Sequence, residues 1–195
     1  MIKINIYFDT EFTGLQKDTN LISIGLISET GEEFYAEFSS INTEVLDSWI
    51  RNNVLNNTVK YGNLQVTDLV LDETNYHFGT KEEIRVELEA WLKQYNDVQL
   101  ISDVCHYDMV LFIDIFGTAF DIPSIVNPYC YDINNDIALY CDISYKEAFN
   151  LNREDFLSEE GIDIKGVKHN SLYDAKVIKE IYELCNNINY NYIKV

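Results

Sequence analysis

Apolar side chains occupy every second position near the start of the chain. Ile6 and Phe8 alternate with more polar residues, and this period of two predicts a β-strand over residues 2–9. Segments 21–28 and 33–39 have the same strand character, and the turn-forming sequence ETGE joins them. Because short connections join the three segments, we expect an antiparallel meander.

After the meander, the period of the apolar positions changes to that of an α-helix. Apolar residues recur near helical spacing in 43–55. Thr80 and Glu83 form a capping box ahead of a long apolar stripe. The intervening residues 56–79 are polar and irregular, and we interpret them as a long surface excursion. The later pattern predicts a buried strand at 98–104, a helix at 107–116, a strand at 137–142, a short helix capped by Ser144 and Glu147, and a closing helix at about 171–186.

The order of these elements predicts the fold class. A three-stranded meander followed by alternating helices and strands gives an α/β protein with a mixed β-sheet flanked by helices. This is the element order of a ribonuclease H-like fold. The length of 195 residues fits one domain spanning 1–195.

The charge of the chain restricts its partners. A net charge of −19 disfavours tight, nonspecific binding to nucleic acid, because a polyanion would be repelled. Phosphate chemistry would therefore depend on bound metal ions and a local basic strip. Lys165, Lys168, Lys176 and Lys179 are close together near the C-terminal end and are candidates for such a strip.

Composition also bears on location and on cysteine chemistry. The sequence has no apolar run approaching the roughly 20 residues that cross a bilayer, and its start lacks the apolar run of a signal peptide, so we expect a cytoplasmic protein. Its four dispersed cysteines favour free, mostly buried thiols over a zinc site or a disulfide framework. Preference for Asn, Ile, Tyr and Lys over Ala and Arg is typical of AT-rich genomes, including those of phages.

Acidic residues recur at element ends. Asp9 and Glu11 share one face of the first predicted strand, about 7 Å apart along the chain, which is close enough to converge on one cation. Asp108 falls in the first turn of a predicted helix that follows a buried strand. Asp174 falls in the first turn of the closing helix, and His169 precedes it by five residues.

These residues, in this order and local context, resemble the motifs of the DEDDh 3'-to-5' exonuclease superfamily. FDTEFTGL matches the first motif, HYDMVLF the second and HNSLYDAKVI the third, and compact bacterial exoribonucleases are the most similar group. The resemblance implies that Asp9, Glu11, Asp108 and Asp174 hold two Mg²⁺ or Mn²⁺ ions. It also implies that His169 takes a proton from the attacking water.

The resemblance further implies a substrate. Phe12 and Thr13 would lie beside the terminal ribose, Leu15 would wedge against the last bases, and Lys168 would contact phosphate. The leading hypothesis is removal of nucleoside 5'-monophosphates from the 3' ends of single-stranded RNA by a chain that could act as a homodimer. One alternative is a DNA exonuclease of proofreading or repair type, because the carboxylate site does not itself read the 2'-hydroxyl. Another is an acidic binding or decoy protein on an inactive nuclease scaffold.

Two further residues are expected to have structural roles rather than roles in catalysis or binding. Asp103 follows the buried strand at 98–104 and is expected to face solvent as a strand-end carboxylate. Trp49 lies at helical spacing in 43–55 and is expected to anchor that helix in the core rather than to stack on a base.

Overall fold

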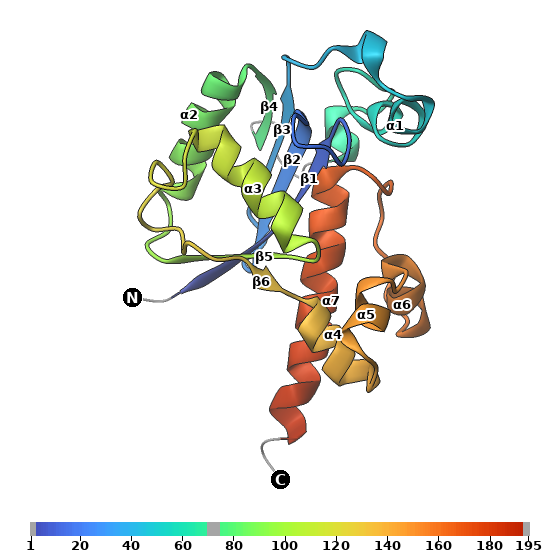
Figure 1. Cartoon of the computed structure of the whole chain (residues 1–195). Helices are drawn as coiled ribbons and strands as arrows, with labels where there is room; N and C mark the ends of the chain where they lie inside the picture. Colours follow the sequence, from blue (N-terminus) through green and yellow to red (C-terminus); the bar gives the residue numbers. More distant parts are fainter. Residues whose placement is uncertain (1–2, 70–74, 193–195) are drawn as a thin grey trace.

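The computed structural model describes residues 3–69 and 75–192 and contains a six-stranded mixed sheet in the order β4-β3-β2-β1-β5-β6 (Figure 1). β1, β2 and β3 form the predicted antiparallel meander, whereas β5 pairs with β1 in parallel and β4 pairs with β3 in parallel. The strands are β1 (Ile4–Phe12), β2 (Leu21–Ser28), β3 (Glu33–Phe38), β4 (Tyr76–Gly79), β5 (Val98–Ser102) and β6 (Tyr131–Asp132). Residue 2, the predicted start of the first strand, lies outside the described residues.

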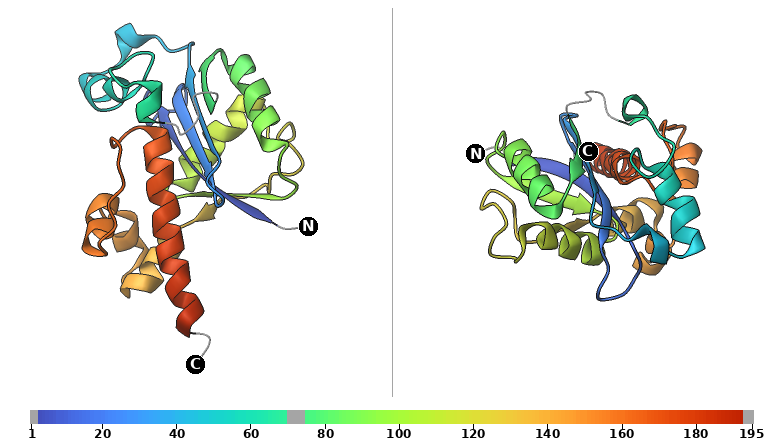
Figure 2. Two further views of the ribbon diagram at one scale, coloured as in Figure 1. Left: turned by 180° about the vertical axis from the view of Figure 1, so that it is seen from behind. Right: turned by 90° about the horizontal axis from the view of Figure 1, so that it is seen from above.

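Helices cover both faces of this sheet, as Figure 2 shows for α2 and α3 on one side and α7 on the other. Ile6 and Phe8 pack with α2 and α3 in one core, whereas Tyr7 packs with α7 in a second core. Successive side chains of β1 therefore pack alternately into the two cores. The helices are α1 (Ser48–Asn53), α2 (Lys81–Leu92), α3 (Cys105–Phe116), α4 (Asn134–Cys141), α5 (Tyr145–Phe149), α6 (Arg153–Glu159) and α7 (Ser171–Tyr192), with 3-10 turns η1 (Thr43–Val45), η2 (Leu55–Asn57) and η3 (Val66–Asp68).

The predicted α/β fold class is confirmed, and so are most of its helices. The capping boxes at Thr80 and Ser144 are present at the starts of α2 and α5. The strand predicted at 137–142 is wrong, because residues 137–141 belong to the helix α4, and Ile137 packs into the second core together with Ile133, the N-cap of this helix. A short apolar run does not by itself distinguish a strand from a buried helix.

The interpretation of 56–79 as an irregular surface excursion is wrong at 76–79, which form β4, whereas most of the other described residues of this segment are exposed or partly exposed. The buried carboxylate of Glu37 on β3 accepts hydrogen bonds from the backbone N–H groups of Val59 at 2.7 Å and Lys60 at 2.8 Å. β4 then adds a strand to the sheet beside β3. The segment is therefore attached to the sheet edge; its residues 70–74 lie outside the described residues.

Two expectations from composition can also be compared with the structure. The four cysteines, Cys105, Cys130, Cys141 and Cys185, are free, as predicted, but the expectation that most of them are buried is wrong, because three are partly exposed. Within residues 3–69 and 75–192, none of the helices combines the length and the apolar character needed to cross a bilayer.

Candidate active site

Strand β1 supplies the first two carboxylates. Asp9 and Glu11 lie inside the strand rather than after it, on the face opposite Phe8 and toward α7. Asp9 lies opposite Gly25 in the β1–β2 ladder. At Gly25, an added Cβ would lie 2.2 Å from the backbone nitrogen of Leu172, so the start of α7 rests directly on this glycine.

Helix α3 supplies the third carboxylate. β5 runs parallel to β1, and α3 begins three residues after β5 ends, which brings Asp108 to the same sheet edge as Asp9. Asp108 is 2 % exposed. Its Oδ1 accepts hydrogen bonds from the backbone N–H of Thr10 at 3.2 Å and from the Thr10 hydroxyl at 2.6 Å, and its Oδ2 accepts one from the Ser102 hydroxyl. These contacts orient the carboxylate firmly.

The first turn of α7 supplies the fourth carboxylate, and the loop before this helix supplies the histidine. Asp174 lies in the first turn of this helix, and its Oδ2 accepts a hydrogen bond from the backbone N–H of His169 at 2.9 Å. The Nδ1 atom of His169 lies 3.8 Å from Oε1 of Glu11. The structure therefore brings together all five residues that the motifs selected.

The cluster is electrostatically unfavourable without a cation. Burial is the main cause, and repulsion from neighbouring carboxylates a smaller one, that raises the pKa of Asp9 and Glu11 well above the ordinary range. The pKa of Asp174 is raised for the same two reasons. Burial raises the pKa of Asp108 to about 7, although its hydrogen bonds from Ser102 and Thr10 oppose the rise. A bound cation would relieve this repulsion.

The donor atoms suit a divalent ion. Glu11, His169 and Asp174 present ligand atoms within 4.8 Å of one another, and so do Asp9, Asp103 and Asp108. Carboxylate oxygens are the ligands that Mg²⁺ and Mn²⁺ prefer. Two adjoining groups of donors therefore fit a pair of such ions.

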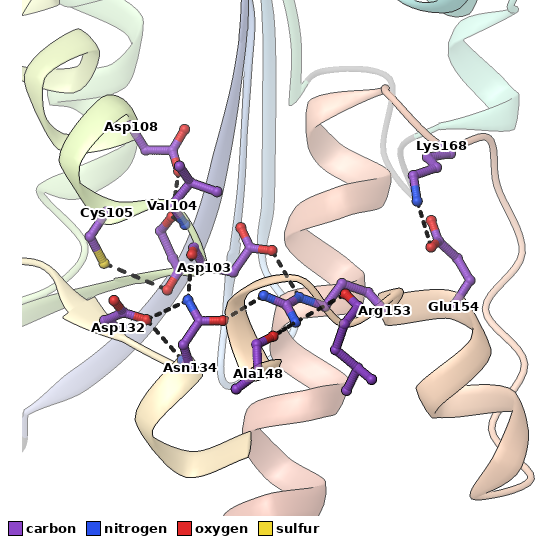
Figure 3. A network of polar contacts seen from close by, with 12 residues as sticks. Asp103, Val104, Cys105, Asp108, Asp132, Asn134, Ala148, Arg153, Glu154 and Lys168 are labelled. Atoms are coloured by element: carbon purple, nitrogen blue, oxygen red, sulfur yellow. Dashed lines mark hydrogen bonds and ion pairs between the residues drawn. The ribbon is translucent and has the colours of Figure 1, made fainter. Parts of the chain in front are cut away.

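Asp103 does not face solvent as expected. Its carboxylate pairs with Arg153 at 3.1 Å, with side chains 18 % and 11 % exposed (Figure 3). Arg153 also donates to the side chain of the buried Asn134 and to the carbonyls of Ala148 and Leu151. This network joins the end of β5 to α4 and α6, and it keeps a fifth carboxylate beside Asp9 and Asp108. The sequence offered no signal for the partner, since Arg153 lies 50 residues away.

Trp49 is likewise not the core anchor that helical spacing suggested. Its side chain is 55 % exposed, and its ring meets that of His169 edge-on with centroids 5.1 Å apart. The buried apolar positions around it are Leu46, Ile50 and Val54, spaced by four, so that Trp49 falls beside this stripe. The spacing in the sequence thus already indicates that Trp49 lies outside the buried stripe.

Two hollows meet at the carboxylates. One, of about 250 Å³, is lined by Asp9, Glu11, Asp174 and His169 among others, with Lys168 and Arg153 at its wall. The second, of about 400 Å³, is lined by Glu11, Phe12, Leu15 and Trp49 with neighbouring residues. Glu11 borders both, so the two hollows lie on either side of its side chain.

The predicted substrate contacts occupy different positions around these hollows. Leu15 is 73 % exposed on the β1–β2 loop. Thr13 is committed to that loop, because its N–H donates to the Asn20 carbonyl at 2.9 Å and its hydroxyl accepts from the Asn20 N–H at 3.0 Å. Lys168 is exposed and pairs with Glu154 at 2.7 Å (Figure 3).

The basic strip is not continuous. The ammonium of Lys176 lies 2.8 Å from Glu33 and donates to the Leu69 carbonyl at 2.8 Å. It therefore ties α7 to β3 and to the segment before residue 70. Lys176 is not the phosphate contact that its position near Asp174 suggested.

A mixed sheet with helices on both faces and a carboxylate cluster where β1, α3 and α7 meet define a protein of the ribonuclease H-like fold. Residues 4–185 match the 3'-5' exoribonuclease Rv2179c-like domain, and the chain belongs to that family. This confirms the resemblance seen in the motifs.

Two similar proteins come from Mycobacterium tuberculosis. The 3'-5' exoribonucleases MT2234.1 and Rv2179c, from two strains of Mycobacterium tuberculosis, are each 27 % identical over 122 residues, which cover 62 % of this chain and 66 % of the relative. The matched part thus spans just under two thirds of the length of these proteins.

Solved structures share the fold at low sequence identity. The nuclease domain of 3'hExo, a DEDDh family member bound to rAMP, has a TM-score of 0.57 at 14 % identity and covers 96 % of this chain and 91 % of its own. The Mg²⁺- and Mn²⁺-bound form of S. pombe Pop2p has a TM-score of 0.58 at 16 % identity, with 92 % and 82 % covered. These similarities support the ribonuclease H-like architecture.

Proposed function

We propose that this chain is a divalent-metal-dependent 3'-to-5' exoribonuclease that releases nucleoside 5'-monophosphates from single-stranded RNA. The observation that carries the proposal is that Asp9, Glu11 and Asp174 line one hollow beside the half-buried His169, and that a carboxylate oxygen of Asp108 lies within 4.8 Å of one of Asp9. Membership of an exoribonuclease family makes hydrolysis of RNA the first reaction to test, and it disfavours the decoy hypothesis.

The metal ions would be held by the four carboxylates. When bound, two divalent ions acidify a water and stabilise the charge that develops on the phosphate and the leaving 3' oxygen. Asp108 is already oriented for this role by Thr10 and Ser102. Asp103, which is paired with Arg153, would offer a further oxygen ligand next to Asp9.

His169 would act as the general base. Burial, followed by the nearby charge of Lys168, lowers the pKa of this imidazole below its ordinary value, so that it is neutral at pH 7. A neutral imidazole accepts a proton from water directly. Its contact with Glu11 and its bond to Asp174 place the ring at the wall of the acidic hollow.

The terminal nucleoside would occupy the second hollow. Phe12 and Leu15 from the β1–β2 loop and Trp49 from α1 offer apolar and aromatic surface for a base and its ribose. The backbone at Thr13 would border the ribose, and Lys168 would approach the phosphate from the rim of the acidic hollow. We therefore include Trp49 among the substrate contacts.

RNA is favoured over DNA because the two mycobacterial relatives are 3'-5' exoribonucleases. A DNA exonuclease remains the second candidate, because the described carboxylates would bind the same phosphate in either polymer. We also expect the protein to act in the cytoplasm and to form a homodimer. Light scattering at several protein concentrations would test the homodimer.

The decisive experiment uses one 20-nucleotide sequence prepared as RNA and as DNA, each labelled at the 5' end, with 3'-hydroxyl and 3'-blocked versions. The proposal expects a ladder of shortening products and free 5'-monophosphates from RNA with an open 3' end, in Mg²⁺ or Mn²⁺ only. Cleavage of the 3'-blocked RNA would show an endonuclease. Faster shortening of the DNA would favour the second candidate.

A further inference from the structure

His169 has a backbone conformation that is uncommon for residues other than glycine. Its φ angle is +61°, in the left-handed region that only a few per cent of non-glycine residues adopt, with asparagine, aspartate and histidine enriched among them. Such a conformation persists only where surrounding contacts impose it. The bond from its N–H to Asp174 is one of these contacts.

The other contacts come from Asn57, which is 112 residues earlier in the chain. Its side-chain amide donates to the carbonyl of Lys168 at 2.8 Å, and its own backbone carbonyl accepts a hydrogen bond from the side chain of Asn170 at 2.9 Å. Asn57 thus bonds to the residue before His169 and to the residue after it. The same amide donates to the carbonyl of Asn53 at 2.7 Å, which links it to the end of α1.

The segment that carries Asn57 is itself held on the sheet. Glu37, fully buried on β3, accepts the N–H groups of Val59 and Lys60 immediately after it. Tyr35 donates its hydroxyl hydrogen to Glu37 at 2.9 Å and accepts a hydrogen bond from Asn170 at 3.0 Å. The sheet therefore supports both Asn57 and Asn170 through one buried carboxylate.

We propose that Asn57 is a positioning residue for His169: by bonding to both neighbours of the histidine, it fixes the left-handed backbone that aims the imidazole at the acidic hollow. This inference rests on the proposed role of His169 as the base. Asn57 would act only through the histidine, because its side-chain bonds among the described residues go to the carbonyls of Asn53 and Lys168 and to none of the four carboxylates. The segment around it, predicted to be a surface excursion, would thus serve the chemistry.

The test is a double-mutant cycle of Asn57→Ala and His169→Ala, with kcat and KM measured on single-stranded RNA. Because small misplacements of a catalytic group are costly, we expect Asn57→Ala to lower kcat by about 10- to 100-fold with KM unchanged. In the His169→Ala background, the same change should have no further effect, because the residue acts only through the histidine. Mg²⁺ affinity measured by calorimetry should be the same with and without Asn57→Ala.

The matched control is Asn56→Ala, because Asn56 is the exposed neighbour and its side chain donates only a long 3.4 Å bond to Asn52. It should keep full kcat. Should Asn57→Ala fail to fold, Asn57→Asp retains the shape and removes the donor, and it carries the same expectations through the same cycle.

An equal loss from Asn57→Ala in both backgrounds would overturn the inference, because it would reveal a general structural role. Full activity of Asn57→Ala beside a strongly impaired His169→Ala would overturn this inference alone and leave the proposed function standing. Full activity of His169→Ala would show that His169 is not the general base, and the positioning role of Asn57 would then be refuted as well.

Discussion

Gly25 lies directly opposite Asp9 in the β1–β2 ladder, and the first turn of α7 rests on it. A side chain at this position would meet the backbone of Leu172, only two residues before Asp174. The absence of a side chain on β2 thus allows the carboxylate of α7 to approach those of β1. The Ser23 and Ser171 hydroxyls, 2.9 Å apart, add a polar contact between the same two elements.

Gly25→Ala should therefore damage the site through the position of α7. A Cβ 2.2 Å from a backbone nitrogen forces α7 to move, and overpacking of this kind costs about 1–3 kcal/mol. For a chain of this size, that is a fall in Tm of roughly 2–4 °C per kcal/mol. Hydrolysis, measured well below the new Tm, should fall much further than the loss of folded protein explains.

Gly31→Ala is the matched control. Gly31 has a φ of +100° with open space around its Cβ position, so alanine there introduces backbone strain without displacing α7. It should lower Tm and leave kcat unchanged in the folded protein. If Gly25→Ala also kept full kcat, the approach of α7 to β1 would not control the site.

The stability of the metal-free protein should depend on pH in a direction set by the carboxylate cluster. Burial raises the pKa of Asp108 to about 7 and raises that of Asp9 as well, so the protonated forms are favoured by folding. This stabilisation is present below the ordinary pKa near 4 and is lost as pH rises through about 7. In chelator, Tm should fall between pH 5 and pH 8, and saturating Mg²⁺ should oppose the fall.

Asp9→Asn tests the same electrostatics by mutation. Removal of one anion from the cluster should raise Tm at pH 8 in chelator, reduce the effect of Mg²⁺ on Tm, and abolish hydrolysis. Asp114→Asn is the control, because Asp114 is exposed on α3 and pairs with Lys81 at 2.8 Å. A metal-free protein whose Tm increased from pH 5 to pH 8 would contradict the predicted repulsion.

His169→Ala should separate the base from the metal ligands. General-base catalysis by one side chain is worth about 10²–10⁴ in rate, so kcat should fall by that factor while RNA binding persists. Since burial lowers the pKa of His169, the acidic limb of the wild-type kcat profile should lie below pH 6.5, and the variant should lack it. We expect Mg²⁺ binding, measured by calorimetry, to be retained; a loss as complete as that of Asp174→Asn would make His169 a ligand instead.

Lys168→Ala should weaken RNA binding and reduce its dependence on salt. Each phosphate contact to a single strand contributes about 0.7 to the slope of log K against log salt, so loss of one contact should flatten the slope by about that amount. Lys93→Ala, at the exposed end of α2 that leads into the start of β5, is a suitable control. An unchanged slope for Lys168→Ala would mean that Lys168 serves only its ion pair with Glu154.

The sequence by itself determined the elements whose side chains alternate or recur within one short segment. The meander, the capped helices α2 and α5, and the start of α7 were all readable, because their patterns depend on neighbours a few residues apart. The same local spacing identified Asp9, Glu11, Asp108, Asp174 and His169, although only the motif resemblance connected them into one site. The strand predicted at 137–142 failed because both a strand and a buried helix accept a short apolar run.

Only the tertiary structure decided which distant groups meet. The ion pair of Asp103 with Arg153, the contact of Trp49 with His169 and the bonds of Asn57 to the histidine loop join residues 50 to 120 positions apart. No local period encodes such contacts, because they arise where β1, β5 and α7 converge after the two cores have packed. The chemistry of the site is thus written in short motifs, whereas its geometry results from long-range packing of the sheet against its helices.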